Sequence, residues 1–429
     1  MTRYLSPLRR IVGPSAAAAA FSAAAVAQIT IDPAVSYPVG QTPSAIAAGD
    51  FDGDGDLDLA VTVNGPDRVQ ILTNVGGAAF APGGVTLLPA GSGAGELVAG
   101  RFDAGTTVDL AVCLQNTGSV MILTNSGAAT FTQAGNISSG LNPRAIITAD
   151  VDGDGDLDLA VANRDSNTAS VLRNAGGSFT ATSITVGNDP RAVALGDFDA
   201  DQDLDLAVSN HGDRNISVFT NTGGGAFAPA GTLAVGANLR PEGVVAADLT
   251  GDGRADLVAA VNGNGLEFVQ VHVASAAGFN AAVNYPSGGL TTAWVAAGDL
   301  DCDGLVDVVS ANQDSNNLSI LRNTGAGVLA AAKLIAVGLN PERPILANLD
   351  RDTDLDIAVA NRNSNDASVA RNRSCRIPGD LNGDDRVDES DLGILLQAWQ
   401  STAAGDIDGD GDTDESDLGL LLANWQRSA

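Results

Sequence analysis

An acidic motif recurs along this chain at nearly constant spacing, and no other feature limits the possible folds so strongly. The copies are GDFDGDGDLDLAV (49–61), ADVDGDGDLDLAV (149–161), GDFDADQDLDLAV (196–208), ADLTGDGRADLVA (247–259), GDLDCDGLVDVVS (298–310) and NLDRDTDLDIAV (348–359). A degenerate copy, GRFDAGTTVDLAV, occupies 100–112. A period of about 50 residues is typical of propellers, solenoids and repeat arrays.

Each repeat unit has the pattern of four short β-strands. In one unit, RAVALGD (191–197) enters the acidic segment, LDLAVSN (204–210) leaves it, and NISVFTN (215–221) and AFAPAGTLAVG (226–236) follow polar or Gly-rich turns. Short apolar or alternating runs bounded by Gly, Asn, Asp and Pro are strand signals. We therefore expect a mainly β fold, a seven-bladed β-propeller over residues 28–375.

The two ends of the repeat region are out of phase by one strand. ITIDPAVSYPVGQTP (29–43) resembles the fourth strand of a unit, whereas the seventh unit stops after its third strand near Cys375. Closure of a ring, with the amino-terminal strand completing the seventh blade, would remove both open edges. An open arc of repeats is the alternative.

The acidic segment has the spacing D-x-D-x-D-G-x-x-D, numbered here as positions 1 to 9. Side chains at positions 1, 3, 5 and 9 and the carbonyl at position 7 can converge on one point, and glycine at position 6 permits the tight turn, as in an EF-hand loop. Hard oxygen ligands at this spacing indicate Ca²⁺. The predicted ligands are Asp50, Asp52, Asp54, Asp56 and Asp58; Asp150, Asp152, Asp154, Asp156 and Asp158; Asp197, Asp199, Asp201, Asp203 and Asp205; Asp248, Asp252 and Asp256; Asp299, Asp301, Asp303 and Asp307; and Asp350, Asp352 and Asp356.

The copies differ in completeness. Gln202 and Thr353 stand at position 6 of the fourth and seventh loops, and Thr250 stands at position 3 of the fifth. The second loop has Arg101 and Gly105 at positions 1 and 5, so we expect it to bind no ion. It is either a plain degenerate loop or one in which Arg101 supplies an internal cation.

Together, the acidic loop, the DLAV strand and the SVLRN strand resemble the calcium loops of FG-GAP and VCBS-type repeats, which occur in integrin α-subunit propellers and secreted bacterial proteins. The resemblance covers all seven units. The bound ions could be structural, pinning each turn, or could accept a carboxylate from a ligand.

The pattern changes after Cys375. PGDLNGDDRVDESDLGILLQAWQ (378–400) and AGDIDGDGDTDESDLGLLLANWQ (404–426) each begin with a loop of EF-hand type and continue into a helix. Leucine and tryptophan stripes at helical spacing, Leu392, Leu395, Leu396 and Trp399 with Leu418, Leu421, Leu422 and Trp425, are expected to form the core. The predicted calcium ligands are Asp380, Asn382, Asp384, Arg386 (by its carbonyl), Asp388 and Asp391, and Asp406, Asp408, Asp410, Asp412 (by its carbonyl), Asp414 and Asp417.

This duplicated loop-helix pair resembles a type I dockerin module. The resemblance implies a dockerin-like calcium-binding domain over 376–429 that docks to a cohesin-like or cell-surface protein. The positions that carry partner preference in that family are here Glu389 and Ser390, with Glu415 and Ser416 in the second copy. Asp385 stands where the first loop would have glycine.

The amino-terminal segment has the features of a secretory signal peptide over residues 1–27. Three arginines precede the apolar run IVGPSAAAAAFSAAA, and AVA before Gln28 fits an A-x-A cleavage site. We expect an extracellular or cell-surface protein; an uncleaved membrane anchor is the alternative. The net charge of -30 and the absence of a basic stripe disfavour nucleic acid as a partner.

Three cysteines allow at most one disulfide. Cys302 lies in the sixth acidic loop and Cys375 follows the third strand of the seventh unit, so both belong on the same face of neighbouring blades and a bridge between them is possible. Cys113, in the strand after the second loop, is expected to be a buried thiol.

Two classes of function remain open from the sequence. A non-catalytic propeller for binding, adhesion or display is favoured, because the mature chain has few residues suited to acid-base catalysis: His211, His272, Lys333, Tyr37 and Tyr285. Both histidines are expected at the surface, and Trp294 is the only tryptophan before the tail that could form a sugar platform. The alternative is a polysaccharide lyase or glycoside hydrolase that carries a dockerin.

If the signal peptide is cleaved after Ala27, the exported protein begins at Gln28. Intact-mass measurement of the exported chain should give the mass of residues 28–429. Exported protein that retains Met1 would contradict this prediction.

Overall fold

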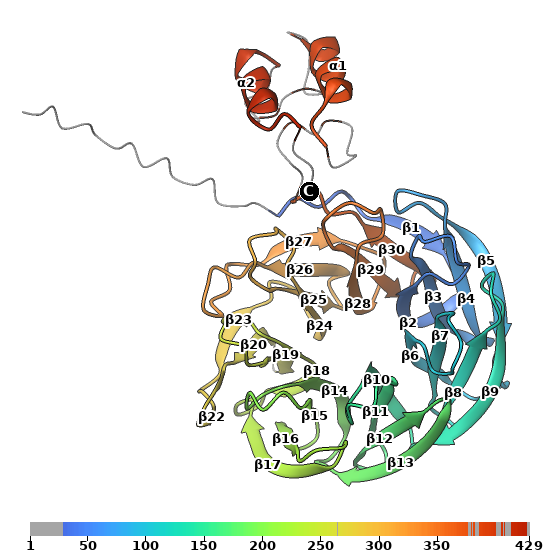
Figure 1. Cartoon of the computed structure of the whole chain (residues 1–429). Helices are drawn as coiled ribbons and strands as arrows, with labels where there is room; N and C mark the ends of the chain where they lie inside the picture. Colours follow the sequence, from blue (N-terminus) through green and yellow to red (C-terminus); the bar gives the residue numbers. More distant parts are fainter. Residues whose placement is uncertain are drawn as a thin grey trace, which may run out of the picture.

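A computed structural model describes residues 29–263, 265–375, 379, 381, 386–399, 405, 407 and 413–426. Its strands form seven four-stranded antiparallel sheets arranged around a central axis (Figure 1). The predicted seven-bladed propeller is therefore confirmed. None of the helices in the described part is long and apolar enough to cross a membrane.

In every blade the strands are hydrogen-bonded in chain order from the axis outward, except at the closure. Blades one to three are β2 (Gln41–Gly49), β3 (Asp58–Gly65), β4 (Asp67–Asn74), β5 (Phe80–Leu87); β6 (Ala94–Gly100), β7 (Asp109–Leu114), β8 (Ser119–Asn125), β9 (Phe131–Ser138); and β10 (Pro143–Ala149), β11 (Asp158–Asn163), β12 (Thr168–Ala175), β13 (Ser178–Thr185). Blades four and five are β14 (Pro190–Gly196), β15 (Asp205–Asn210), β16 (Asn215–Asn221), β17 (Phe227–Ala234); and β18 (Arg240–Ala247), β19 (Asp256–Gly263), β20 (Leu266–His272), β23 (Val283–Pro286), with the short pair β21 (Ala274–Ser275) and β22 (Gly278–Phe279). Blades six and seven are β24 (Thr292–Gly298), β25 (Asp307–Asn312), β26 (Asn317–Leu321), β27 (Lys333–Ala336); and β28 (Pro341–Ala347), β29 (Asp356–Asn361), β30 (Asp366–Ala370) and β1 (Val35–Pro38).

The ring closes as the phase of the repeats predicts. β1 pairs antiparallel with β30, from Val35 opposite Val369 to Pro38 opposite Asp366. The carboxylate of Asp32 lies 3.1 Å from Nε of Arg373, and Nζ of Lys333 donates to the carbonyl of Ile29 at 2.6 Å. The open-arc alternative is thereby excluded.

The second strand of each blade is buried on both faces, because a neighbouring blade covers each side. In β11, all six residues of DLAVAN are buried. One sequence expectation is wrong: His272 ends the third strand of blade five, β20, whose last four residues are buried, so it is 2% exposed although it alternates with valines, and its Nε2 lies 2.9 Å from Oε1 of Gln270. Burial lowers the pKa of His272 to about 4. His211 lies in the turn after β15, as predicted, and its side chain is half-buried there, 15% exposed.

The cysteines behave as the sequence suggests. Cys302 and Cys375 form a disulfide with their Cα atoms 5.5 Å apart, which links the sixth acidic loop to the end of blade seven. Cys113 is a free, fully buried thiol whose pKa burial raises well above its usual value.

An asparagine at the end of the third strand joins neighbouring blades in six of the seven cases. Asn125, in blade two, donates its Nδ2 to the carbonyl of Phe51 in blade one at 2.8 Å and to that of Val108 at 3.2 Å. Equivalent bonds come from Asn74, Asn174, Asn221, Asn323 and Asn372. Blade five has Ala274 at this position and lacks the link.

Replacing Asn125 by alanine should therefore lower the free energy of unfolding by about 1–3 kcal/mol, because buried hydrogen bonds are left unmade. Urea unfolding followed by circular dichroism measures this change. Asn136→Ala, on the exposed outer strand of the same blade, is the matched control and should change stability by less than about 0.5 kcal/mol. Equal effects of the two substitutions would contradict the role of the link.

Candidate metal centres

The acidic loops connect the first and second strands of every blade and therefore lie on one face of the propeller. Each begins where the innermost strand ends; the third loop, for example, runs from the end of β10 to the start of β11. The predicted carboxylates of six loops are thus placed at equivalent positions around one rim.

The aspartate at position 9 is fully buried in all seven loops and is already hydrogen-bonded. In the third loop, Asp158 accepts the backbone N–H of Val151 at 2.9 Å on one oxygen and that of Asn174 at 2.7 Å on the other. The degenerate second loop keeps the same pair of bonds at Asp109. Position 9 is therefore in the first place a structural pin between the loop and the third strand, whichever loops bind metal.

Burial next to other carboxylates raises the pKa of these position-9 groups. The pKa of Asp58, Asp205 and Asp356 rises to about 6, and that of Asp307 to about 7, with desolvation as the largest cause in each. A nearby cation would oppose this shift, because it favours the ionised carboxylate.

Position 1 shapes the turn. Asp150 accepts the N–H of Gly153 at 2.7 Å and that of Gly155 at 2.9 Å, and Asp50, Asp197 and Asp248 accept equivalent bonds. The residue at position 6 is left-handed in these loops; even Gln202 adopts φ 76° and keeps the turn. Thr353 in the seventh loop is not left-handed, and that loop has a different shape.

The structure brings together three carboxylates in each of five loops, with oxygens within 4.8 Å of one another. The groups are Asp50, Asp52, Asp58; Asp150, Asp152, Asp158; Asp197, Asp199, Asp205; Asp299, Asp301, Asp303; and Asp350, Asp352, Asp354. In the first, third and fourth loops positions 1, 3 and 9 converge, whereas position 5 (Asp54, Asp154, Asp201) accepts the N–H of position 7. Within the described residues, the fifth loop, with Thr250 at position 3, forms no such group.

The sequence pattern did not predict the side chain of Asp354 as a metal ligand. It stands at position 7, where a carbonyl ligand is expected, but its side chain is 1% exposed and belongs to the carboxylate group of the seventh loop. The signal that could have found it is the loss of glycine at position 6, which changes the turn.

Several of these carboxylate oxygens are buried without a hydrogen-bond partner. They are Oδ1 of Asp152, Asp299, Asp301, Asp350 and Asp354, and Oδ2 of Asp352. An unpaired buried carboxylate oxygen beside like charges is unfavourable unless a cation is bound. The donor set, all hard oxygens on a loop whose backbone is already folded, fits Ca²⁺.

Comparison with known proteins identifies the repeats. The model of the FG-GAP-like repeat matches residues 102–161, 150–208, 197–259 and 299–359, and that of the FG-GAP repeat matches 42–94. The chain belongs to the FG-GAP repeat family. No curated protein matches it.

Solved structures similar to this FG-GAP protein share its fold at low identity. A Lactobacillus plantarum protein is 16% identical with a TM-score of 0.56, over 71% of this chain and 87% of that one. Virginiamycin B lyase from Staphylococcus aureus is 13% identical with a TM-score of 0.54, over 80% and 99%. BBS1N, in complex with ARL6DN, is 12% identical with a TM-score of 0.54, over 79% and 96%.

Arginines lie beside some of the FG-GAP loops. Arg322 lies 3.3 Å from Asp301 and 3.4 Å from Asp303, and Arg373 lies 3.5 Å from Asp350. Arg101 does not act as an internal cation: it is exposed and forms no ion pair within the described part of the chain. The second loop keeps the backbone hydrogen bonds of Asp109 without carboxylates at positions 1 and 5.

The carboxy-terminal segment contains two short helices, α1 (Glu389–Ala398) and α2 (Glu415–Ala423). Asp388 and Asp414, predicted as metal ligands, are their N-caps, and Asp391 and Asp417 complete capping boxes. Asp391 also accepts the N–H of Leu381 at 2.7 Å, and Asp417 that of Ile407 at 2.5 Å. Arg386 is described; the predicted ligands Asp380, Asn382, Asp384, Asp406, Asp408, Asp410 and Asp412 lie outside the described residues.

The helices pack through Val387, Leu395 and Leu421, with Leu392, Trp399, Leu418 and Trp425 against them. The expectation that the whole leucine stripe is core is wrong for Leu396 and Leu422, which are 56% and 54% exposed. Two short helices offer one another only a narrow contact, so part of each stripe faces outward.

Asp152→Asn should remove one calcium site, because it neutralises a half-buried carboxylate of the third loop whose Oδ1 is buried without a hydrogen-bond partner. Calorimetric titration of the variant should show one ion fewer than wild type, with a lower melting temperature in calcium but not in EGTA, where the lost repulsion stabilises the apo loop. Asp103→Asn in the second loop is the matched control, and its stoichiometry should equal that of wild type. Unchanged stoichiometry in Asp152→Asn would contradict a metal site there.

Proposed function

We propose that this chain is an exported, calcium-stabilised FG-GAP propeller that binds or displays a ligand without catalysis and is attached through a dockerin-like carboxy-terminal module. The observation that carries the proposal is the set of buried, unpaired carboxylate oxygens repeated along one face of the ring. Bound Ca²⁺ would neutralise them and contribute free energy of folding.

Two features support export. The amino-terminal sequence has the composition of a signal peptide, and the Cys302–Cys375 disulfide is of the kind that persists in oxidising compartments. In these loops the carboxylates that would bind Ca²⁺ also accept hydrogen bonds from backbone N–H groups, so we expect weak calcium affinity. Millimolar calcium outside the cell would suit such sites.

The carboxy-terminal helices support docking. Glu389 and Ser390 at the start of α1 are exposed, as are Glu415 and Ser416 at the start of α2. The outward-facing Leu396 and Leu422 occupy equivalent positions in the two copies. A cohesin-like partner would meet the same short surface in either of two orientations.

The described residues give less support to the alternative that the propeller is an enzyme. His272 is buried in a strand, and both ring nitrogens of His211 are occupied, Nδ1 at 3.0 Å from Asp189 and Nε2 at 3.1 Å from Glu242. Trp294 is 7% exposed and cannot form an open sugar platform. The lyase among the similar structures shares only the fold, at 13% identity.

The choice between binding and catalysis can be tested on the mature protein in calcium. A glycan and protein array, read beside an assay for polysaccharide degradation, should show capture without product release. Release of oligosaccharide products would overturn the non-catalytic proposal.

Chelation should abolish docking but leave the propeller folded. In EGTA the small module should lose any cohesin-like partner, because its acidic loops repel one another without metal, whereas the β-sheet circular dichroism of the larger propeller should persist. Asp380→Ala with Asp406→Ala should reproduce the loss at saturating calcium. Asp50→Ala with Asp150→Ala, in the propeller, is the control that should still dock. Capture in EGTA, or by the first double variant, would rule out calcium-dependent docking.

A further inference from the structure

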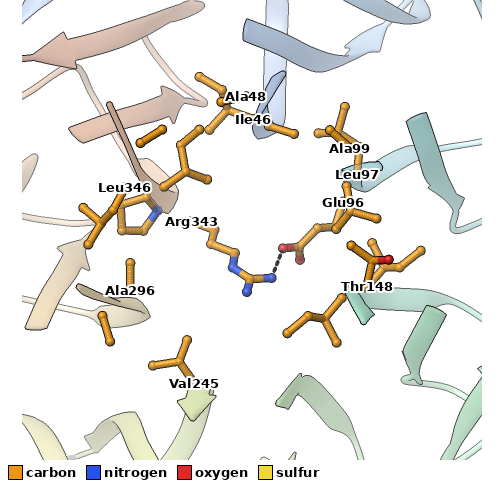
Figure 2. Close-up of a pocket in the computed structure, with 18 of the residues that line it drawn as sticks. Ile46, Ala48, Glu96, Leu97, Ala99, Thr148, Val245, Ala296, Arg343 and Leu346 are labelled. Carbon is orange, nitrogen blue, oxygen red and sulfur yellow. Dashed lines mark hydrogen bonds and ion pairs between the residues drawn. The ribbon is translucent and has the colours of Figure 1, made fainter. Parts of the chain in front are cut away.

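The innermost strands surround a central cavity of about 490 Å³. Its walls are made almost wholly of alanine, valine, isoleucine and leucine, including Ala48, Val98, Ile147, Val245 and Leu346. Glu96 and Arg343 are the only charged side chains among its lining residues, and Figure 2 shows them pointing toward one another across it. An apolar cavity of this size with a few convergent polar groups has the character of a small-molecule site.

The ion pair joins blades that are not neighbours. Glu96 belongs to β6 in blade two and Arg343 to β28 in blade seven, with blade one between them. Their NH1 and Oε1 atoms are 2.5 Å apart. Register shifts in both strands, between Ala94 and Leu97 and between Pro341 and Pro344, occur where the two side chains leave the wall. Such bulges re-aim a side chain.

The pair leaves hydrogen-bonding groups unused. Within the described residues, Arg343 makes this one side-chain hydrogen bond, although a guanidinium carries five N–H donors. None of its remaining nitrogens is among the fully buried atoms without a partner, so they stay accessible from the cavity. The guanidinium can therefore donate hydrogen bonds to a second carboxylate while it keeps its bond to Glu96.

The side chains around the pair carry a surplus of positive charge. Glu342 is contacted by Nε1 of Trp294 at 3.2 Å and by Arg362 at 3.5 Å, and the Arg144 guanidinium lies 5.8 Å from the centre of the Trp294 ring. With Arg343 and Glu96, this network holds three arginines and two glutamates, in a protein of net charge -30. One additional anion would balance it.

We propose that the central channel binds an amphipathic carboxylic acid, whose carboxylate accepts hydrogen bonds from Arg343 and whose apolar body lies along the channel wall. Glu96 is a positioning residue that holds the guanidinium toward the axis. A neutral apolar molecule would leave the donors of Arg343 unused, and a cationic head would add to the existing positive surplus. The inference deepens the proposed function, on which it rests, because it assigns the propeller a ligand of its own.

The test uses the mature full-length protein in calcium and three probes with the same alkyl chain: decanoate, decanol and decylamine, each below its micellar concentration. Calorimetry should show saturable binding of decanoate, at least tenfold tighter than that of the alcohol or the amine. Equal affinity for the three probes, tighter binding of the amine, or no binding of decanoate would overturn the proposal.

Arg343→Gln together with Glu96→Gln removes both charges at once, so that neither side chain is left as an unpaired charge. This variant should unfold at a temperature close to that of wild type and lose the preference for decanoate. Retained preference would show that the acid binds elsewhere.

A second variant tests the place of the apolar body. Ala296→Leu, on the wall, should weaken decanoate binding at least tenfold, whereas Ala181→Leu on the exposed strand β13 should leave it unchanged. Equal effects would place the alkyl chain outside the channel. Binding to the glycan and protein array and capture of a docking partner are measured on the same samples to separate the two proposals. If partners are captured but decanoate does not bind, only the proposed channel ligand is overturned.

Discussion

The buried aspartate at position 9 of each loop is the interaction on which the rest of the propeller depends. Its two oxygens accept one N–H from the start of the loop and one from the end of the third strand, so a single carboxylate joins three elements of a blade. The asparagine that donates to this carboxylate uses its own side chain to reach the preceding blade. Loop geometry, blade geometry and contact between blades are therefore coupled through one hydrogen-bonded pair.

That arrangement concentrates negative charge at one rim. The pin itself must be ionised to accept two N–H bonds well, yet burial and the neighbouring aspartates raise its pKa. A bound cation would resolve the conflict, because it would stabilise the ionised form of the whole cluster. Where carboxylates have been lost, as in the second loop, the position-9 aspartate keeps both of its backbone hydrogen bonds.

The opposite ends of the innermost strands have a different chemistry. There lie the arginine–glutamate ion pairs of the described residues, Arg191 with Glu242, Arg362 with Glu342 and Arg343 with Glu96. The acidic rim suits cations, whereas the arginine-containing end and the apolar channel suit an anionic amphipathic molecule. The two faces of the ring are built from the two ends of the same strands, and both carry arginines beside carboxylates.

The number of blades, the position of each acidic loop and the closure by β1 could be predicted from the sequence alone. A motif repeated at fixed spacing marks the same turn in each blade, and the phase of the strands at the two ends of the repeat region indicates the closure. Tertiary structure decided the rest. Alternation predicted an exposed His272, but a strand between two blades is buried on both faces. Spacing predicted convergence at position 5; Asp303 and Asp352 lie in their carboxylate groups, whereas Asp154 accepts a backbone N–H and lies outside the group of its loop. Glu96 and Arg343 are far apart in the chain, and they meet only because the ring closes and brings blades two and seven to the two sides of blade one.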